Sequence, residues 1–391
     1  MQYLNKIQRI ALYLFFFSIN FEMLTPINDN KYISIAKIFG LVYFISTLTQ
    51  FKLFIKLDNV RYYLFPIVIF FGLDTLMELL NVNEIASQYF NFTILLNIIF
   101  LLIMINHERK DYMILEKGML SFAFGTILLA ILYNFRIGTT YFMGRLSMFG
   151  EDQNYIAART SVGIIVLALA ITQNRLKLGW YRFLFLLALP LMVKLLFETG
   201  SRLGFISLTM SFLIAIILYK TENFPRKVMA LTLGIISLFI VGIILFQSET
   251  LVNRLIDSKE TGNMAGRIEI WKTLIPIIKE HPIFGIGHNG YIFQTTEIYG
   301  NEISPHNVIL EILCYTGIIG LILYLVFLFR IAMTSYLSYK RYNILLPLIL
   351  LIPVAGMILS IQILTLKIGW IIFAYIISSS AIQSNQNKLI T

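Results

Sequence analysis

The chain has 391 residues, a net charge of +10 and a mean hydropathy of +0.78, with 58% hydrophobic and 13% charged residues. A soluble domain carries about 25% charged residues, so this composition excludes an ordinary soluble globular protein. The lysines and arginines lie mostly in short segments between apolar runs, as membrane topology requires, which argues against nucleic-acid binding. The one cysteine, Cys314, excludes an intramolecular disulfide and a cysteine-based zinc site.

Twelve apolar runs follow one another along the chain, each close to the ~20 residues that a helix needs to cross a bilayer. The apolar residues are continuous rather than alternating, which favours helices over a β-barrel. We therefore predict an all-α, polytopic transmembrane helical bundle of about twelve spans. The predicted spans are 8–25, 33–51, 62–80, 89–106, 113–133, 155–173, 180–197, 201–219, 228–246, 306–329, 343–362 and 365–381. Only Ile363 and Leu364 separate the last two, and neither favours a turn.

Positively charged residues alternate between the gaps that separate these runs. Short gaps predicted to face outward carry few of them, so the alternation predicts that both termini are cytoplasmic. The first run resembles a signal peptide but lacks a clear small-residue cleavage site, so we predict a retained helix. The inward side carries Lys6, Arg9, Lys52, Lys56, Arg61, Arg109, Lys110, Arg175, Lys177, Lys220, Arg226, Lys227, Arg330, Lys340 and Arg341.

The segment 247–305 is far longer than the usual connection between helices. It divides the chain into residues 1–246 with nine predicted helices, this large outward loop, and residues 306–391 with three more. A helical pattern within the loop predicts an amphipathic helix on the outer membrane face, bent at Pro276. The residues that follow this pattern are Ala265, Ile268, Trp271, Leu274, Ile275 and Ile278.

Three predicted helices begin on the outer side with polar residues: 150–154, 199–202 and 304–307. In the last of these, Ser304 suits the N-cap and Pro305 the first helical position. His306 would then lie in the first turn, where the helix dipole disfavours imidazolium and keeps a neutral base available. Such helix starts also favour anions such as a diphosphate. A purely structural role for His306, as a capping residue, is equally compatible with the spacing.

Charged residues also occur in the outer halves of the spans, where their cost makes a functional role the default hypothesis. They are Glu22, Lys37, Asp74, Glu78, Arg159 and Lys194. The alternative is a structural ion-pair network in which Asp74 and Glu78 pair with Lys37 or Lys194. Arg202 and Arg267 are better candidates for substrate binding, because guanidinium matches the geometry of phosphate. The alternative for Arg202 is a side chain that extends to the membrane interface.

Two motifs are rejected as cofactor sites. Residues 285–290 match the dinucleotide-binding fingerprint by letter, but no strand–turn–helix context surrounds them. Their glycines more readily indicate a tight turn. His281 and His288 have no partner at metal-ligand spacing, so we predict no metal site.

The stretch from about residue 145 to 330 resembles the bacterial O-antigen ligase and polymerase superfamily, the Wzy/WaaL-type membrane proteins. The most specific part is His306-Asn307, followed by nine residues, Gly317, two residues and Gly320. The other resembling pieces are Arg145 with Asp152-Gln153-Asn154, Gly200-Ser201-Arg202, Gly266-Arg267 through Trp271, and Pro282 through Gly287.

This resemblance implies a metal-independent, inverting glycosyltransferase without a cofactor, in cell-surface polysaccharide biosynthesis. The donor would be a glycan on undecaprenyl diphosphate, and the acceptor a sugar hydroxyl on lipid A core or on a growing polysaccharide. Transfer would occur on the outer face of the bacterial inner membrane, with contacts to a flippase and a chain-length regulator among the expected partners. Arg202 and Arg267 would hold the diphosphate, and His306 would orient or deprotonate the acceptor. Further expected substrate-binding residues are Arg145, Asp152, Asn154, Trp271 and Asn307.

The main alternative is a transporter, such as a lipid-linked oligosaccharide flippase. A transporter would more naturally show repeated halves with broken helices near the middle of the membrane. The polar residues lie instead at the outer ends of the spans, beneath a long loop, which favours chemistry. A passive structural protein would leave the outer arginines and histidine unexplained.

Overall fold

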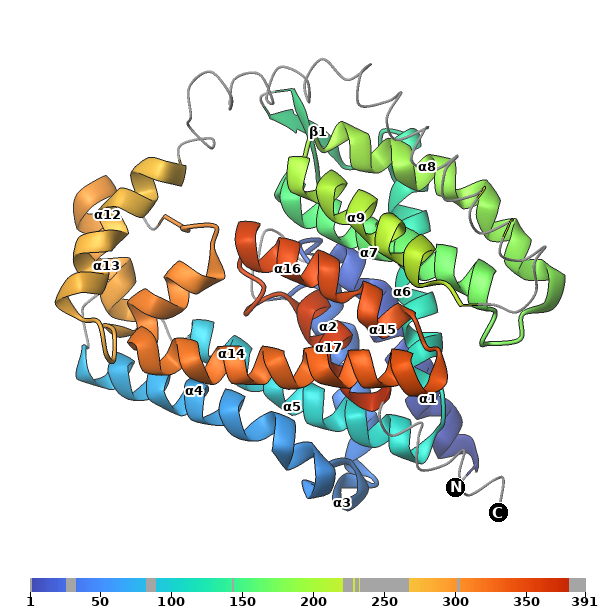
Figure 1. Ribbon diagram of the computed structural model, residues 1–391, viewed down its shortest axis with the longest axis horizontal. Coiled ribbons are helices and arrows are strands. Elements are labelled where there is room, and N and C mark those ends of the chain that lie inside the picture. Colours follow the sequence, from blue (N-terminus) through green and yellow to red (C-terminus); the bar gives the residue numbers. More distant parts are fainter. Residues whose placement is uncertain are drawn as a thin grey trace.

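The computed structural model describes residues 2–25, 33–81, 89–142, 144–220, 267–300 and 303–379, together with residues 228 and 232. In these residues the protein is a helical bundle with one small β-hairpin (Figure 1). The first half contains α1 (Gln2–Ser18), η1 (Ile19–Phe21), α2 (Ile35–Leu48), α3 (Phe51–Phe54), η2 (Asp58–Val60), α4 (Arg61–Leu80), α5 (Tyr89–Lys110), α6 (Ile114–Asn134), β1 (Thr139–Phe142) and β2 (Arg145–Met148). The second half contains α7 (Gln153–Gln173), η3 (Gly179–Leu184), α8 (Phe185–Glu198), α9 (Arg202–Leu218), α12 (Arg267–Glu280), α13 (Gly287–Tyr299), α14 (Val308–Tyr342), α15 (Leu346–Ile349), α16 (Leu351–Ser360) and α17 (Lys367–Ser379).

Helices occupy eleven of the twelve predicted spans, and the remaining one, 228–246, lies outside the described residues except for residues 228 and 232. Among the described residues, six helices are long and apolar enough to cross a membrane: Arg61–Leu80, Phe90–Lys110, Ile114–Asn134, Gln153–Gln173, Gly179–Glu198 and Val308–Tyr342. Four more are apolar but shorter: Ile35–Leu48, Arg202–Leu218, Leu346–Ser360 and Lys367–Ser379. At 1.5 Å per residue, these fall short of a full ~30 Å crossing. The multi-pass helical prediction is confirmed, and the count of twelve stays a prediction.

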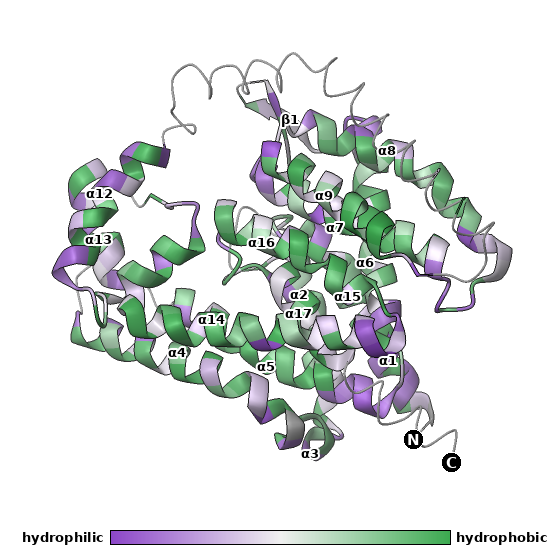
Figure 2. Ribbon diagram, viewed as in Figure 1, coloured by the Kyte–Doolittle hydropathy of each residue, from purple (hydrophilic) through white to green (hydrophobic). Residues whose placement is uncertain are grey.

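Most helices of the bundle are hydrophobic along much of their length, as expected for a protein surrounded by lipid (Figure 2). Helix α17 is buried along all of its residues and packs against α5 and α14. Large apolar side chains such as Leu187 on α8, Ile217 on α9 and Phe329 on α14 are instead exposed. In water such a surface would drive association, so it identifies the faces that contact lipid tails.

The expectation of an all-helical protein is wrong at one place. Strands β1 and β2 form an antiparallel hairpin between α6 and α7, with Thr139 opposite Met148. Threonine and aromatic residues in β1 favour a strand, and Gly138 and Gly144 adopt the positive φ that a tight connection requires. Four-residue strands are too short to give a clear alternating pattern, so this hairpin was not predicted.

Two helix boundaries also differ from the prediction. Helix α14 continues to Tyr342, through residues 330–342 that were predicted as a cytoplasmic connection, and it ends at Asn343 in the left-handed conformation. Between α16 and α17, residues 361–366 turn despite their apolar character. The Trp370 and Asn97 side chains donate to backbone carbonyls there, including that of Leu364, and so satisfy a turn that lacks turn-forming residues.

Candidate active site at the polar end of the bundle

Most of the predicted site residues gather at one end of the bundle, which we call the polar end. It comprises residues 20–22 after α1, the β1–β2 hairpin, the starts of α7, α9, α14 and α17, and the loop before α14. Side-chain hydrogen bonds and ion pairs connect several of these segments. The polar helix starts thus lie at one end of the bundle, and the side of the membrane that this end faces stays a prediction.

A buried ion-pair network lies at the polar end. Arg159 of α7 donates to Glu22 at 2.8 Å and to Glu151, which precedes α7. Lys367, at the start of α17, pairs with the other oxygen of Glu22. All four side chains are largely buried, so their charges depend on one another. Burial raises the pKa of Glu151 to about 7, against the opposing effect of Arg159. Glu22 and Arg159 thus have structural partners, and Lys367 was not anticipated.

A second cluster joins the hairpin to the starts of α7 and α9. Arg145 of β2 donates from Nε to the carbonyl oxygen of Thr199 at 3.0 Å and from Nη2 to Asn154 Oδ1 at 3.1 Å. The hydroxyl of Ser201 donates to the same Asn154 oxygen at 3.0 Å. Ser201 is also the N-cap of α9 and therefore fixes Arg202 in the first position of that helix. Asn154 thus connects Arg145 with Ser201, the residue that precedes Arg202.

His306 occupies a different position from the one predicted. Asn307 is the N-cap of α14 and accepts from the backbone of Ile309 at 3.0 Å and Leu310 at 3.3 Å. His306 precedes this cap and has a φ of 49°, and its backbone N–H donates to Ser304 Oγ at 3.1 Å. Asparagine and serine are comparably good N-caps. Asn307 rather than Ser304 caps this helix, which therefore begins at Val308. The histidine therefore lies just outside the helix rather than in its first turn.

The electrostatic surroundings of His306 come from three segments. Burial lowers its pKa, the positive charge of Arg267 lowers it further, and Asp152 opposes both. Its Nδ1 atom is buried without a hydrogen-bond partner in the described part of the chain. Because the net shift is downward, the imidazole is neutral at physiological pH. The neutral form that was predicted is thus favoured by burial and by Arg267 rather than by a first-turn dipole, and the role of His306 as a base stays a prediction.

Helix α12 covers this histidine. Trp271 donates from its indole nitrogen to the carbonyl oxygen of Pro305 at 2.9 Å, which ties α12 to the loop carrying His306. Arg267, the first residue of α12, reaches the carbonyl oxygen of Ser360 at the end of α16, at 3.3 Å. The amphipathic helix predicted in the long loop is therefore present as Arg267–Glu280 and runs through Pro276. The loop contains a second helix, α13, that was not predicted.

The glycines between α12 and α13 allow the backbone to approach a break in α14. At Gly317 the helix is interrupted, with φ 59° and ψ −159°. The freed backbone groups pair with the α12–α13 turn, where Ile286 donates to Cys314 and Ile318 donates to Pro282. A β-carbon on Gly317 would lie 2.4 Å from the backbone of Ile283, and one on Gly285 would lie 2.5 Å from the Cys314 oxygen. The predicted tight turn is confirmed, and its partner is the broken helix (Figure 1).

The remaining intramembrane carboxylates lack the predicted basic partners. Glu78 accepts from the Asn91 side chain, and neither oxygen of Asp74 has a hydrogen-bond partner among the described residues. Lys194 instead donates to Asn134 at 3.2 Å. The pairing of Asp74 and Glu78 with Lys37 or Lys194 is therefore wrong. The sequence shows that two carboxylates share a helix face, but not which helix packs against that face.

His288 packs as an aromatic residue. Its ring stacks on Phe90 with the centroids 4.1 Å apart and meets Tyr315 edge-on at 5.0 Å. Burial lowers its pKa to about 3, so it is uncharged. Within the described residues, no group of three or more histidine, cysteine, aspartate or glutamate side chains is arranged to hold a metal ion.

Comparison with known proteins gives one family match. Residues 187–325 match the family described as O-Antigen ligase. The matched segment contains Arg202, Arg267 and His306, whereas Arg145 and Asn154 precede it. No curated protein matches the chain. The match over residues 187–325 supports a relationship to the O-antigen ligase/polymerase superfamily and a general role in membrane glycan ligation.

Proposed function

We propose that this protein transfers a glycan from a polyprenyl diphosphate carrier to a sugar hydroxyl at the polar end of the bundle. One observation carries the proposal. His306, inside the family-matched segment, is a neutral, half-buried histidine whose Nδ1 atom is buried and unpaired among the described residues, within the electrostatic influence of Arg267 and Asp152. A neutral imidazole with a free nitrogen has the chemistry of a general base for a hydroxyl nucleophile.

The proposed reaction is a single displacement. The acceptor hydroxyl oxygen attacks the anomeric carbon, the bond from that carbon to the diphosphate oxygen breaks, and the hydroxyl proton passes to His306. Attack opposite the leaving group inverts the anomeric configuration. Asp152 stabilises the imidazolium that forms, because its negative charge raises the pKa of His306.

The two arginines of the matched segment would stabilise the departing diphosphate. Arg267 begins α12 and Arg202 begins α9, so each lies at a helix amino terminus where the dipole also favours an anion. Stabilising charge that develops on the leaving group is commonly the largest electrostatic contribution in such transfers. Arg145, Asn154, Trp271 and Asn307 then act mainly as supports, through the hydrogen bonds described above.

The carrier, acceptor and location form part of the same proposal. Undecaprenyl diphosphate would carry the glycan, and lipid A core or another polysaccharide repeat would accept it. The polar end would face the outside of the bacterial inner membrane, where a flippase delivers the donor. A chain-length regulator is the further expected partner if the product is a polymer.

The experiment that tests this function is the envelope glycan profile of a strain lacking the gene, with lipid-linked and finally anchored glycans separated. Single repeat units in place of a ladder would identify a polymerase. Full-length chains that persist on the carrier but are absent from the acceptor would identify a ligase. Unchanged pools, in a strain without a redundant gene, would contradict the proposed transfer.

The transporter alternative rests on the break at Gly317, since broken helices are frequent at transport sites. In this protein, however, the α12–α13 turn fills the break with backbone hydrogen bonds. A transporter would leave lipid-linked glycan on the cytoplasmic side when the gene is lost. Accessibility of that glycan to a membrane-impermeant glycosidase, on inverted and on right-side-out vesicles, separates the two functions.

A further inference from the structure

A second candidate site lies at the opposite end of the bundle, which we call the basic end. Helix α7 separates it from the polar end by 21 residues, or about 30 Å. A cavity of about 1250 Å³ opens there between the ends of α7, α9 and α14 and the start of α6. Small-molecule sites usually occupy ~300–1,000 Å³, so this cavity has room for a large ligand.

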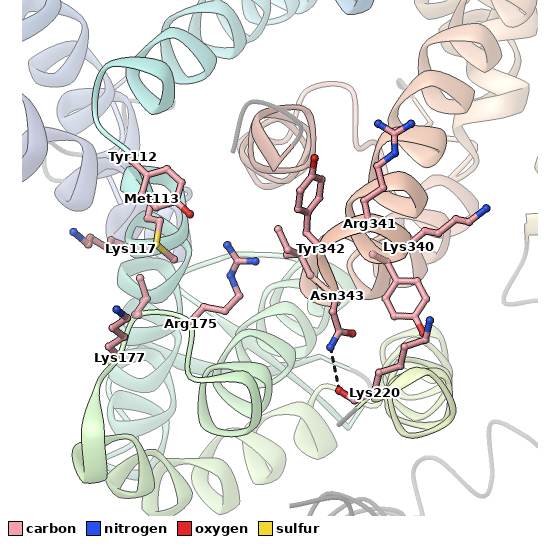
Figure 3. A pocket seen from close by; sticks show the side chains of 13 residues that line it. Tyr112, Met113, Lys117, Arg175, Lys177, Lys220, Lys340, Arg341, Tyr342 and Asn343 are labelled. Atoms are coloured by element: carbon pink, nitrogen blue, oxygen red, sulfur yellow. Dashed lines mark hydrogen bonds between the residues drawn. The ribbon is translucent and has the colours of Figure 1, made fainter. Parts of the chain in front are cut away.

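Cationic side chains surround this basic cavity. Figure 3 shows Lys117 and Lys177 on one side and Lys220, Lys340 and Arg341 on the other, with Arg175 between them. Arg175 is neutralised by Glu116, at 3.0 Å. Within the described part of the chain, the other five have no carboxylate within 4.0 Å. The cavity therefore presents an excess of positive charge to any ligand.

Hydrogen bonds hold together several of the segments that line the basic cavity. The side chain of Gln173 donates to the backbone oxygen of Asn343 at 3.0 Å and accepts from the backbone of Leu345. Asn343 in turn donates to the carbonyl oxygen of Lys220 at 3.0 Å, the bond drawn in Figure 3. These bonds join the end of α7 to the segments that follow α9 and α14, so Lys220, Lys340 and Arg341 lie on segments that are held together.

An apolar cavity adjoins the basic one. A small cavity of about 20 Å³ shares Arg175 and Leu176 with the basic cavity, and it shares Leu169 with an apolar cavity of about 110 Å³. The apolar cavity lies between α7, α8 and α9. Tyr219, which lines it, directly precedes Lys220 of the basic cavity. The charged cavity and the apolar cavity thus lie close to each other in the bundle.

We propose that the basic cavity binds the headgroup of an anionic phospholipid and that the apolar cavity takes the start of one of its acyl chains. Basic pockets between transmembrane helices are a recurrent site for such headgroups. Topology alone requires cations on a cytoplasmic face, but it does not require a framed cavity or an adjoining apolar one. The order of the two compartments matches the order of headgroup and chain in a phospholipid.

Native mass spectrometry of the full-length protein in a neutral detergent tests the proposal. Phosphatidylglycerol and phosphatidylcholine with identical chains are titrated separately. The wild-type protein retains one phosphatidylglycerol at concentrations where phosphatidylcholine is lost. The triple variant Lys117→Gln/Lys340→Gln/Arg341→Gln binds it roughly 100-fold more weakly, at about fivefold per charge removed.

The matched control is Lys52→Gln/Lys56→Gln/Arg61→Gln, which removes the same charge from exposed residues outside the cavity. It keeps phosphatidylglycerol affinity within about threefold of wild type. Equal losses in the two triple variants, or no preference for phosphatidylglycerol, would overturn the proposal. Complete displacement by inorganic phosphate or by glycerophosphoglycerol would also overturn it, because the ligand would then be a soluble phosphate. Ala168→Phe, which fills the apolar cavity, weakens retention several-fold, and unchanged retention would exclude the acyl chain from that cavity.

Discussion

At the scale of single residues, His306 determines the proposed chemistry. Replacing it by alanine removes the general base, and we expect the transfer rate to fall by about 10²–10⁴-fold. Measurement uses purified lipid-linked donor and labelled acceptor. His306→Gln keeps a polar side chain of similar size without a basic nitrogen, and it should be equally inactive. Full activity of His306→Gln would show that the side chain only positions the acceptor.

The same residue predicts a pH dependence. Because burial and Arg267 lower the pKa of His306, the neutral form persists as the pH falls below 6.5, the ordinary value. Transfer should therefore be insensitive to pH near 7 and should decline only below the ordinary histidine pKa of 6.5. In Asp152→Asn, which removes the opposing charge, the acid limb should move to still lower pH. A limb that moves upward would contradict this electrostatic assignment.

Arg267 tests whether the leaving group is recognised by shape as well as by charge. Arg267→Lys keeps the charge but loses the planar fork that matches phosphate, so we expect a large loss of transfer despite the conserved charge. The measurement is the rate at saturating acceptor. The matched control is Lys272→Ala, an exposed cation one and a half turns along the same helix, whose removal should leave the rate unchanged. Wild-type rates in Arg267→Lys would reduce its role to general electrostatic attraction.

We predict that the buried ion-pair network around Arg159 stabilises the fold and does not take part in catalysis. Arg159→Met leaves Glu22 and Glu151 buried without their shared partner, and removing one member of such a network costs about 3–5 kcal/mol. We expect little folded protein, measured as the monodisperse fraction after detergent extraction. Arg9→Met is the control, because Arg9 pairs with Asp111 at an exposed position. Normal yield of Arg159→Met would contradict the structural assignment.

At the scale of elements, the break in α14 depends on glycine at two places. Gly317→Ala places a β-carbon 2.4 Å from backbone atoms of Ile283 and imposes a positive φ on alanine. Backbone strain alone costs about 1–3 kcal/mol, and the clash adds to it. Gly285→Ala should behave alike, with both variants melting at lower temperature in detergent. Gly72→Ala, inside α4 with open space around it, is the control that should melt at or above the wild-type temperature.

At the scale of the whole molecule, hydropathy and charge predicted the helices well, because each span must satisfy its own backbone in lipid. The polar helix starts and the arginines were predicted at the ends of spans because charged side chains are costly within lipid. The partners of buried charges were not predictable, as Lys367 and Asn91 show. Those pairings depend on which helices pack together, and one sequence contains no direct record of that packing. The β-hairpin and the long α14 were missed because short strands and charged helix ends give weak local patterns.

The orientation of the whole bundle is the last prediction. The alternation of charge predicts that the polar end faces outward and that both termini are cytoplasmic. A single cysteine introduced as Lys272→Cys on α12 should react with a membrane-impermeant maleimide in cells with a permeabilised outer layer. Lys52→Cys, on α3, should react only after the inner membrane is opened. The native Cys314 is buried and gives a low background. Reaction of Lys52→Cys in intact membranes would show that the bundle has the opposite orientation. The proposed chemistry would then lie in the cytoplasm, where a flipped donor is absent.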